Sequence, residues 1–317
     1  MKSVNYFLIA AMVFSLTAFA SADVIVKQQT SSDMMGMMKI NVDGTEYIKG
    51  DKSCNMSKMK MGGGMAGMMG DAGGTDVYEI TRVDMGVKWN LDSRTKAYTE
   101  TNLSAIKDMM GGDKSYEQGG PGMGMGDEAE YDWTVEVTSS DDEVDINGFK
   151  CKNLTGKATG VGVKNPDEKM QLTFEYWYAV DVPGKDELTS YYKSMASATG
   201  TEMMTNQKGA EAFYGMYGDQ FGEMFKKLDE SGGYPIKTVI LVEGNQDKGG
   251  MGGGNANLDD ENIPAGMKDM LSGMMGKKDD QGGLKTMFSV TNEVTSIEET
   301  AIDDSQFEIP EGYSKGQ

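Results

Sequence analysis

The sequence predicts a mainly β fold of the α+β class, built on an antiparallel sheet. Segments of alternating apolar and polar residues recur between turn signals, which is typical of an antiparallel meander. Two longer stretches repeat apolar residues at helical spacing. The 43 glycines and 29 methionines often stand together in runs, which indicates long loops between the framework elements.

The first 22 residues have the pattern of a cleavable signal peptide. Lys2 precedes an apolar run over 7–20, and Ala20-Ser21-Ala22 supplies the small residues of a cleavage site. We therefore expect cleavage after Ala22, a single domain over 23–317, and a periplasmic or secreted protein. No later run approaches the roughly 18 apolar residues of a membrane span. An uncleaved segment that acts as an anchor is the alternative.

The composition excludes several classes of function. The formal charge of -20 becomes -21 when Lys2 leaves with the signal peptide, so the surface repels nucleic acid and anionic lipid. The chain has no histidine, and therefore no Ser/His or Cys/His pair. It also has no GxSxG elbow and no phosphate-binding Gly-Lys-Ser/Thr loop. Its 50 acidic residues point to no particular catalytic pair. We predict that the protein is not an enzyme and has no catalytic residues.

Six strands are expected in the first third of the chain. Asp43-Gly44 predicts a two-residue hairpin turn between the second and third strands. Asp92-Ser93-Arg94 predicts a turn between the fifth and sixth. The predicted strands are 24–29, 38–42, 45–49, 77–83, 87–91 and 96–101.

Six more strands are expected after residue 130. Asn147-Gly148 is the strongest hairpin signal in the chain, because both residues tolerate the positive φ that a type I′ turn needs. The predicted strands are 131–138, 143–146, 149–158, 170–180, 236–243 and 284–298.

Two amphipathic helices are expected to pack on the sheet. The first begins near Pro183-Gly184-Lys185-Asp186, and its apolar side chains are Leu188, Tyr191, Tyr192 and Met195. The second covers 209–228, with Phe213, Met216, Met224 and Leu228 on one stripe and Phe221 and Phe225 beside it.

Four insertions are predicted to be disordered loops, because glycine at this density costs much backbone entropy to order. They cover about 58–74, 109–127, 245–257 and 266–283. Met267, Met270, Leu271 and Met274 in the last of them have the spacing of a short apolar helix face.

The chain has two cysteines, Cys54 and Cys151. In an oxidising compartment an even pair predicts a disulfide, which here would close a loop near a hundred residues long. Two buried free thiols, or two soft-metal ligands, are the alternatives.

Short segments in the predicted strands and turns are spread in order over most of the chain. They are Tyr47-Ile48-Lys49-Gly50-Asp51, Trp89-Asn90-Leu91-Asp92, Lys96-Ala97-Tyr98-Thr99-Glu100, Asn147-Gly148-Phe149-Lys150-Cys151-Lys152, Tyr176-Trp177-Tyr178-Ala179 and Phe307-Glu308-Ile309-Pro310-Glu311-Gly312-Tyr313. Together they resemble a secreted bacterial family of unknown function that is similar to the lipoprotein carriers LolA and LolB. The resemblance implies an antiparallel half-open barrel with helices covering its concave side, and no catalytic residues. The glycine- and methionine-rich insertions depart from the usual pattern of the family.

The first functional hypothesis is noncatalytic binding of a hydrophobic or acylated ligand, or of a lipoprotein-like protein partner. Aromatic side chains between sheet and helices would line the cavity, and methionine adapts to irregular apolar surfaces. The candidate lining residues are Phe174, Tyr176, Trp177, Tyr178, Tyr191, Tyr192, Phe213 and Phe221. The alternative is that these side chains form the core.

The second hypothesis is binding or buffering of Cu(I) or Ag(I) by thioethers, which are soft ligands without a proton to lose. Two methionine clusters carry it: Met34, Met35, Met37 and Met38, and then Met56, Met59, Met61, Met65, Met68 and Met69. Low-complexity drift, or methionines that absorb oxidants, are the alternatives. Zinc and Cu(II) are disfavoured because histidine is absent. No other cofactor is expected.

Overall fold

Twelve strands form one sheet in the part of the chain that the computed structural model describes, which is residues 23–36, 38–63, 75–106, 131–200, 226–227, 230–245 and 283–316. The mainly β class predicted from the sequence is confirmed. The strands are β1 (Val24–Met34), β2 (Met38–Lys49), β3 (Lys52–Gly62), β4 (Thr75–Arg82), β5 (Val87–Asp92), β6 (Ala97–Asn102), β7 (Tyr131–Ile146), β8 (Phe149–Gly162), β9 (Lys169–Ala179), β10 (Tyr234–Gly244), β11 (Lys285–Glu299) and β12 (Ser314–Lys315).

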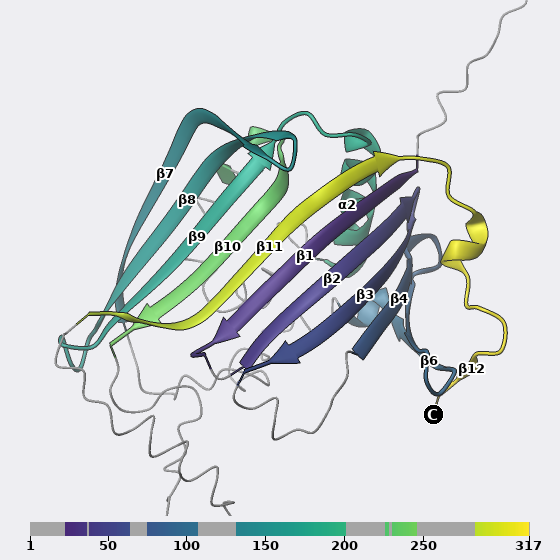
Figure 1. The fold of residues 1–317 in the computed structure, drawn as a ribbon, viewed down its shortest axis with the longest axis horizontal. Helices are drawn as coiled ribbons and strands as arrows, with labels where there is room; N and C mark the ends of the chain where they lie inside the picture. Colours follow the sequence, from purple (N-terminus) through teal and green to yellow (C-terminus); the bar gives the residue numbers. More distant parts are fainter. Residues whose placement is uncertain are drawn as a thin grey trace, which may run out of the picture.

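The sheet consists of two antiparallel meanders that meet in its middle (Figure 1). Strands β1 to β6 run outward in one direction, and β11 back to β7 run outward in the other. The meanders join where β1 pairs with β11 over the whole length of β1. The short β12 adds a parallel pair beside β6. The described sheet is open, with β12 and β7 at its ends.

The turn predicted at Asp43-Gly44 is absent, because both residues lie within strand β2. Asp43 and Gly44 lie inside an unbroken strand, where Gly44 is opposite Gln28 of β1 and Ser57 of β3. The chain reverses instead at Met35-Gly36, with φ of 53° and 71°, and at Gly50, with φ of 54°. The predicted hairpin at Asp43-Gly44 is wrong because continuous pairing with two neighbouring strands outweighs the local turn preference.

At two other places the strands are longer than the sequence predicted. Predicted strands 131–138 and 143–146 are one strand, β7, with an irregularity between Ser140 and Val144. Of the insertion predicted to be disordered over 58–74, residues 58–62 belong to β3, which continues to Gly62, and residues 64–74 lie outside the described residues. The turn at Asn147-Gly148 is confirmed by φ values of 54° and 87°.

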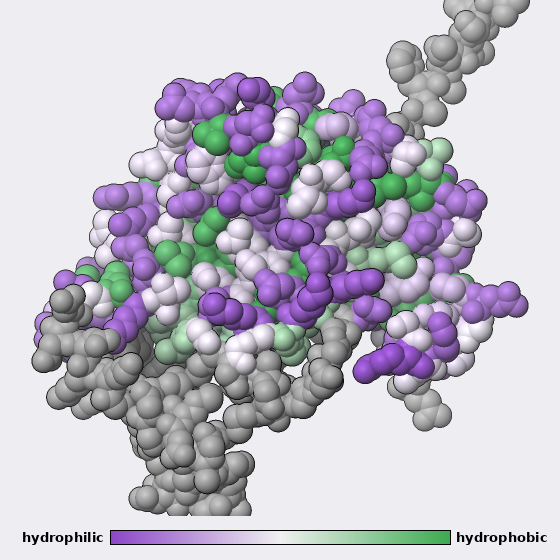
Figure 2. Space-filling model, viewed as in Figure 1, coloured by the Kyte–Doolittle hydropathy of each residue, from purple (hydrophilic) through white to green (hydrophobic). Residues whose placement is uncertain are grey.

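The helix α2 (Lys185–Thr199) lies against one face of the sheet, which we call the inner face. It begins after Gly184 at φ 63°, where an added Cβ would lie 2.1 Å from Val24 Cγ2. Only glycine fits there, so Gly184 sets how closely the helix approaches β1. Figure 1 is viewed from the opposite, outer face, with α2 behind the strands. Hydrophilic side chains cover much of that outer face (Figure 2).

Short helical turns lie between or after strands. The helix η1 (Val83–Met85) joins β4 to β5, and residues 103–106 are helical directly after β6. The helix η3 (Asp304–Phe307) follows β11.

The remaining predicted helices and insertions lie outside the described residues. This holds for 109–127, for 245–257 except Asn245, for 266–283 except Gly283, and for most of the predicted helix over 209–228, of which residues 226–227 are helical.

Three groups of buried side chains hold the sheet. The helix cluster joins α2 to the central strands through Val24, Val26, Ile48, Leu188 and Tyr191. The aromatic cluster lies on β8 to β11 around Leu172, Phe174, Tyr176, Ile240 and Val242. The C-terminal cluster lies on the outer face, where Ile302 and Phe307 from the chain around η3 cover Cys54, Ile80, Trp89 and Leu91.

Candidate functional site

The register of the strands aligns apolar side chains in two continuous rows across the inner face. The first row contains Val137, Gly156, Phe174, Ile240, Val290, Ser32, Ile40 and Met61, each directly opposite the next on the neighbouring strand. The second contains Val135, Ala158, Leu172, Val242, Phe288, Met34 and Met38. Directly opposite residues share a face of the sheet, so the rows form one surface. We call these two rows the apolar floor.

The floor has a buried centre and less buried flanks. Leu172 and Phe174 are fully buried, whereas Val290, Val135 and Ile40 are only partly buried. Met61, at the β3 end of the first row, is 38% exposed. Apolar surface therefore extends beyond the packed core toward both β3 and β7.

The helix α2 lies over a different part of the inner face. Its apolar side chains Leu188, Tyr191 and Tyr192 belong to the helix cluster, which contains no residue of the apolar floor. The two regions are successive parts of one face: Val24 and Val26 of β1 lie beneath the helix, and Ser32 and Met34 belong to the floor.

The aromatic residues predicted to line one cavity divide between these regions. Phe174 and Tyr176 are fully buried and lie stacked, with ring centroids 6.2 Å apart. Tyr178 packs against the same aromatic cluster. Trp177, Tyr191 and Tyr192 instead pack in the helix cluster. Phe213 and Phe221 lie outside the described residues.

Sequence reasoning missed the aliphatic members of the floor. Ile240, Val242 and Val290 were placed in strands but not recognised as part of a surface. The alternation of apolar residues along β7, at Val135 and Val137, was available as a signal. The sequence held no signal for which strands would lie side by side, because their order depends on the β1–β11 pairing.

Beside the apolar contacts beneath α2, the inner face also holds a buried polar network that includes the carboxyl group of Glu46. Tyr192 donates a hydrogen bond of 3.0 Å to Glu46 Oε2, and the Tyr191 and Ser53 hydroxyls are 2.6 Å apart. Glu46 is 1% exposed. Desolvation, followed by the charge of Glu46, raises the pKa of Tyr191, Tyr192 and Tyr234 well above the usual range. These tyrosines stay neutral hydrogen-bond donors, and the network fixes α2 on β2 and β3.

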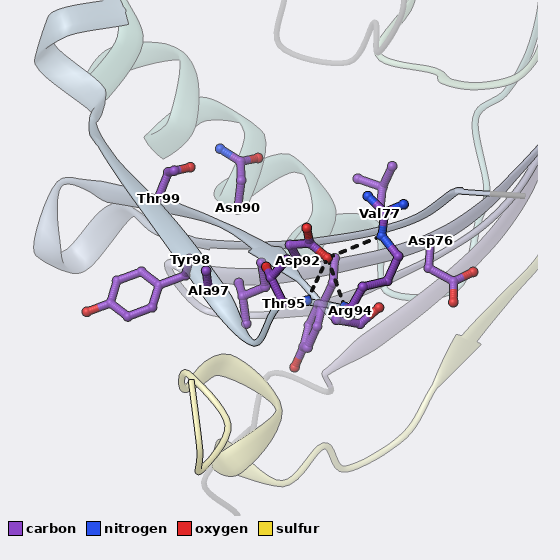
Figure 3. Close-up of a pocket in the computed structure, with 12 residues that line it drawn as sticks. Asp76, Val77, Asn90, Asp92, Arg94, Thr95, Ala97, Tyr98 and Thr99 are labelled. Atoms are coloured by element: carbon purple, nitrogen blue, oxygen red, sulfur yellow. Dashed lines mark hydrogen bonds and ion pairs between the residues drawn. The ribbon is translucent and has the colours of Figure 1, made fainter. Parts of the chain in front are cut away.

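A cavity of about 520 Å³ lies at the β5–β6 hairpin (Figure 3). Asp92 accepts hydrogen bonds from the backbone amides of Arg94 at 2.8 Å and Thr95 at 3.3 Å, which closes the hairpin tip. Asn90 and Thr99 are directly opposite each other and point to the same side of the hairpin in Figure 3. The polar groups here hold the turn together, so we assign the cavity a structural role.

The structure brings part of the two methionine clusters together. Met34 and Met38 belong to the second row of the floor and Met61 to the first, and Met59 is two residues before Met61 on the same face. Met35 is in the β1–β2 turn. Met56 faces the other way, with its sulfur 3.6 Å from Gln306 Nε2. Met37, Met65, Met68 and Met69 lie outside the described residues.

The predicted disulfide between Cys54 and Cys151 is wrong. Both cysteines are buried free thiols, Cys54 in the C-terminal cluster and Cys151 in the helix cluster. Their strands, β3 and β8, are six places apart in the sheet, which corresponds to about 28 Å at the usual strand spacing. A disulfide needs Cα atoms within about 7 Å. Burial raises the pKa of each thiol to about 11, which keeps both protonated.

Among the described residues, neither a metal centre of carboxylates and thiols nor a membrane-spanning helix is found. That part of the chain contains no group of three or more Cys, Asp or Glu side chains placed to hold a metal ion. Among its helices, none has the length and apolar character of a membrane span. No protein-family model and no curated protein matches the chain.

Proposed function

We propose that the protein binds a hydrophobic ligand, such as an acyl chain or the acylated part of a partner, on the apolar floor. The observation that carries this proposal is the continuity of the two rows, which cross eight and seven strands with Ser32 as their only side chain that carries a hydroxyl or charge. The centre of the rows is buried, and the apolar surface left for a ligand lies toward their ends, where Met61 is 38% exposed.

The partly buried flanks support binding rather than core packing alone. Leu172 and Phe174, at the centre of the floor, are buried completely. Ile40 and Met61 retain exposure on the same surface and are not among the side chains that pack against the aromatic cluster, whereas Val290 is partly buried against it. A flexible apolar chain lying along the floor would remove that surface from water, at about 25 cal/mol for each Å².

We also propose how the sheet is curved and where the protein acts. The sheet would curve as a half-open barrel, with α2 and a second helix covering its concave side. The predicted signal peptide would deliver the protein to the periplasm or beyond. The protein would act as a noncatalytic carrier or binding protein there, without a resident cofactor.

A neutral probe tests the proposal, because the negative charge of the protein repels anionic dyes. N-phenyl-1-naphthylamine is titrated into the purified protein and its fluorescence followed. We expect saturable enhancement, and binding at least about tenfold weaker in Val290→Lys, because the ammonium group opposes desolvation of the floor. Thr291→Lys is the matched control, since Thr291 is the next residue, is equally partly buried and faces outward.

Thermal unfolding shows whether both variants remain folded. Equal probe binding by the two folded variants, or no binding by the unaltered protein, would overturn the proposal.

A further inference from the structure

We propose that Met34, Met38 and Met61 form a thioether site for a soft monovalent cation, Cu(I) or Ag(I), at the edge of the apolar floor. This site goes beyond hydrophobic binding, because it takes a metal ion and depends on sulfur rather than on apolar area. Two methionine runs that are separate in the sequence supply it.

The strand register brings the three residues together. Met34 and Met38 flank the β1–β2 turn and are directly opposite each other, which places their Cβ atoms about 5 Å apart. Ile40 is opposite Met61, so Met61 is diagonal to Met38 on the same face, at about 7–8 Å. Three rotatable bonds let each thioether cover that distance.

Neighbouring contacts hold the strand ends that carry the sulfurs. The amide of Met35 donates to the carbonyl of Met287 at 3.1 Å, which ties the β1–β2 turn to β11. The amide of Gly36 donates to Asp33 Oδ1 at 2.7 Å, and that carboxylate also pairs with Lys39 at 3.1 Å. The backbone is therefore held while the methionine side chains stay accessible: Met61 is 38% exposed, and Met34 and Met38 are partly buried.

The surroundings suit a soft cation. Direct neighbours of the three residues on the inner face include Ser32, Ile40, Phe288 and Met59, and Met59 would add a fourth thioether beside Met61. None of these carries a positive charge that would repel the ion, and none offers the nitrogen or carboxylate ligands that harder divalent ions prefer. Thioethers bind Cu(I) without losing a proton, so binding there is insensitive to pH near neutrality.

Purified protein labelled with [ε-¹³C]methionine is titrated with Ag(I), a redox-stable probe for Cu(I), and the methyl resonances are followed by NMR. We expect Met34, Met38 and Met61 to shift together with one stoichiometric equivalent of silver. The variant M34L/M38L/M61L keeps the apolar volume and removes the sulfurs, so silver affinity at this site should fall at least about tenfold.

The matched control is M56L/M85L, which removes two methionines that are 40% and 53% exposed and lie outside the site. Silver binding should be unchanged in it. N-phenyl-1-naphthylamine binding should survive in the M34L/M38L/M61L variant, which separates this inference from the hydrophobic function. Silver shifts confined to other methionines, or an affinity unchanged by M34L/M38L/M61L, would overturn the proposal.

Discussion

At the scale of single residues, burial decides the chemistry of the two cysteines. Cys54 and Cys151 are both fully buried, and desolvation of the thiolate raises the pKa of each to about 11. The Gln306 amide donates to Cys54 Sγ at 3.2 Å, which opposes this shift without reversing it. The residues therefore pack as small apolar side chains.

Thiol labelling checks this assignment. The native, nonreduced protein should react with dithionitrobenzoate only slowly, because its thiols are protonated and inaccessible. In guanidinium chloride without reductant, both thiols of the chain should react at once. Failure to release them on unfolding would show that the cysteines are oxidised in the native protein.

At the scale of elements, the β1–β2–β3 sheet shows how pairing overrides a local turn signal. Gly44 has strand geometry, and a Cβ added there would lie 3.4 Å from Gln28 Cγ, whereas Gly50 has φ 54° and lies at the reversal between β2 and β3. The backbone therefore requires glycine at position 50, where φ is positive, but not at position 44, where it is extended.

Alanine substitutions distinguish the two positions. Gly44→Ala should change the free energy of unfolding by less than about 1 kcal/mol, because alanine adopts extended geometry and reduces the freedom of the unfolded chain. Gly50→Ala should cost about 1 kcal/mol or more, because alanine resists positive φ. Urea unfolding measures both. The reverse order would mean that the chain turns at Gly44.

At the scale of the whole molecule, an ion pair ties the sheet to the segment that follows η3. Arg82 of β4 holds Asp84 at 2.7 Å and reaches Glu308 near the C-terminus at 2.6 Å. Hydrogen bonding from Arg82 holds the pKa of Asp84 below its usual range. Hydrogen bonding from Asn147, followed by Lys237, does the same for the pKa of Glu293.

The lowered pKa values of Asp84 and Glu293 predict that the folded protein loses stability in acid. A carboxyl group with a lower pKa in the folded state than in the unfolded state binds protons more readily when unfolded. Its stabilising contribution is present above the unfolded pKa, near about 4, and is lost as pH falls through the folded pKa. The free energy of unfolding should therefore decrease from about pH 6 to about pH 3.

Arg82→Gln should show a smaller decrease over that range, because it removes the cause of the shift at Asp84. Urea titrations at each pH provide the measurement. An equal decrease in both proteins would mean that Arg82 does not govern the acid response.

Local patterns were enough to predict much of the fold. Alternating residues in β8 to β11, the Asn147-Gly148 turn and the apolar spacing of α2 are properties of neighbouring residues, and each prediction is confirmed. Many methionines and no histidine left two classes of ligand, hydrophobic molecules and soft metal ions, and the family resemblance placed the hydrophobic class first. That functional hypothesis remains a proposal.

Only the tertiary structure decided which of these elements meet. The pairing of β1 with β11 joins the two meanders, aligns the apolar rows and separates Cys54 from Cys151. The pairing of β2 with β1 and with β3 brings methionines from two separate runs onto one part of the inner face. Nothing local to β1 or β11 specifies their pairing, because residues from opposite ends of the chain form it. It depends on the free energy of burying both strands at once, which belongs to the folded chain as a whole.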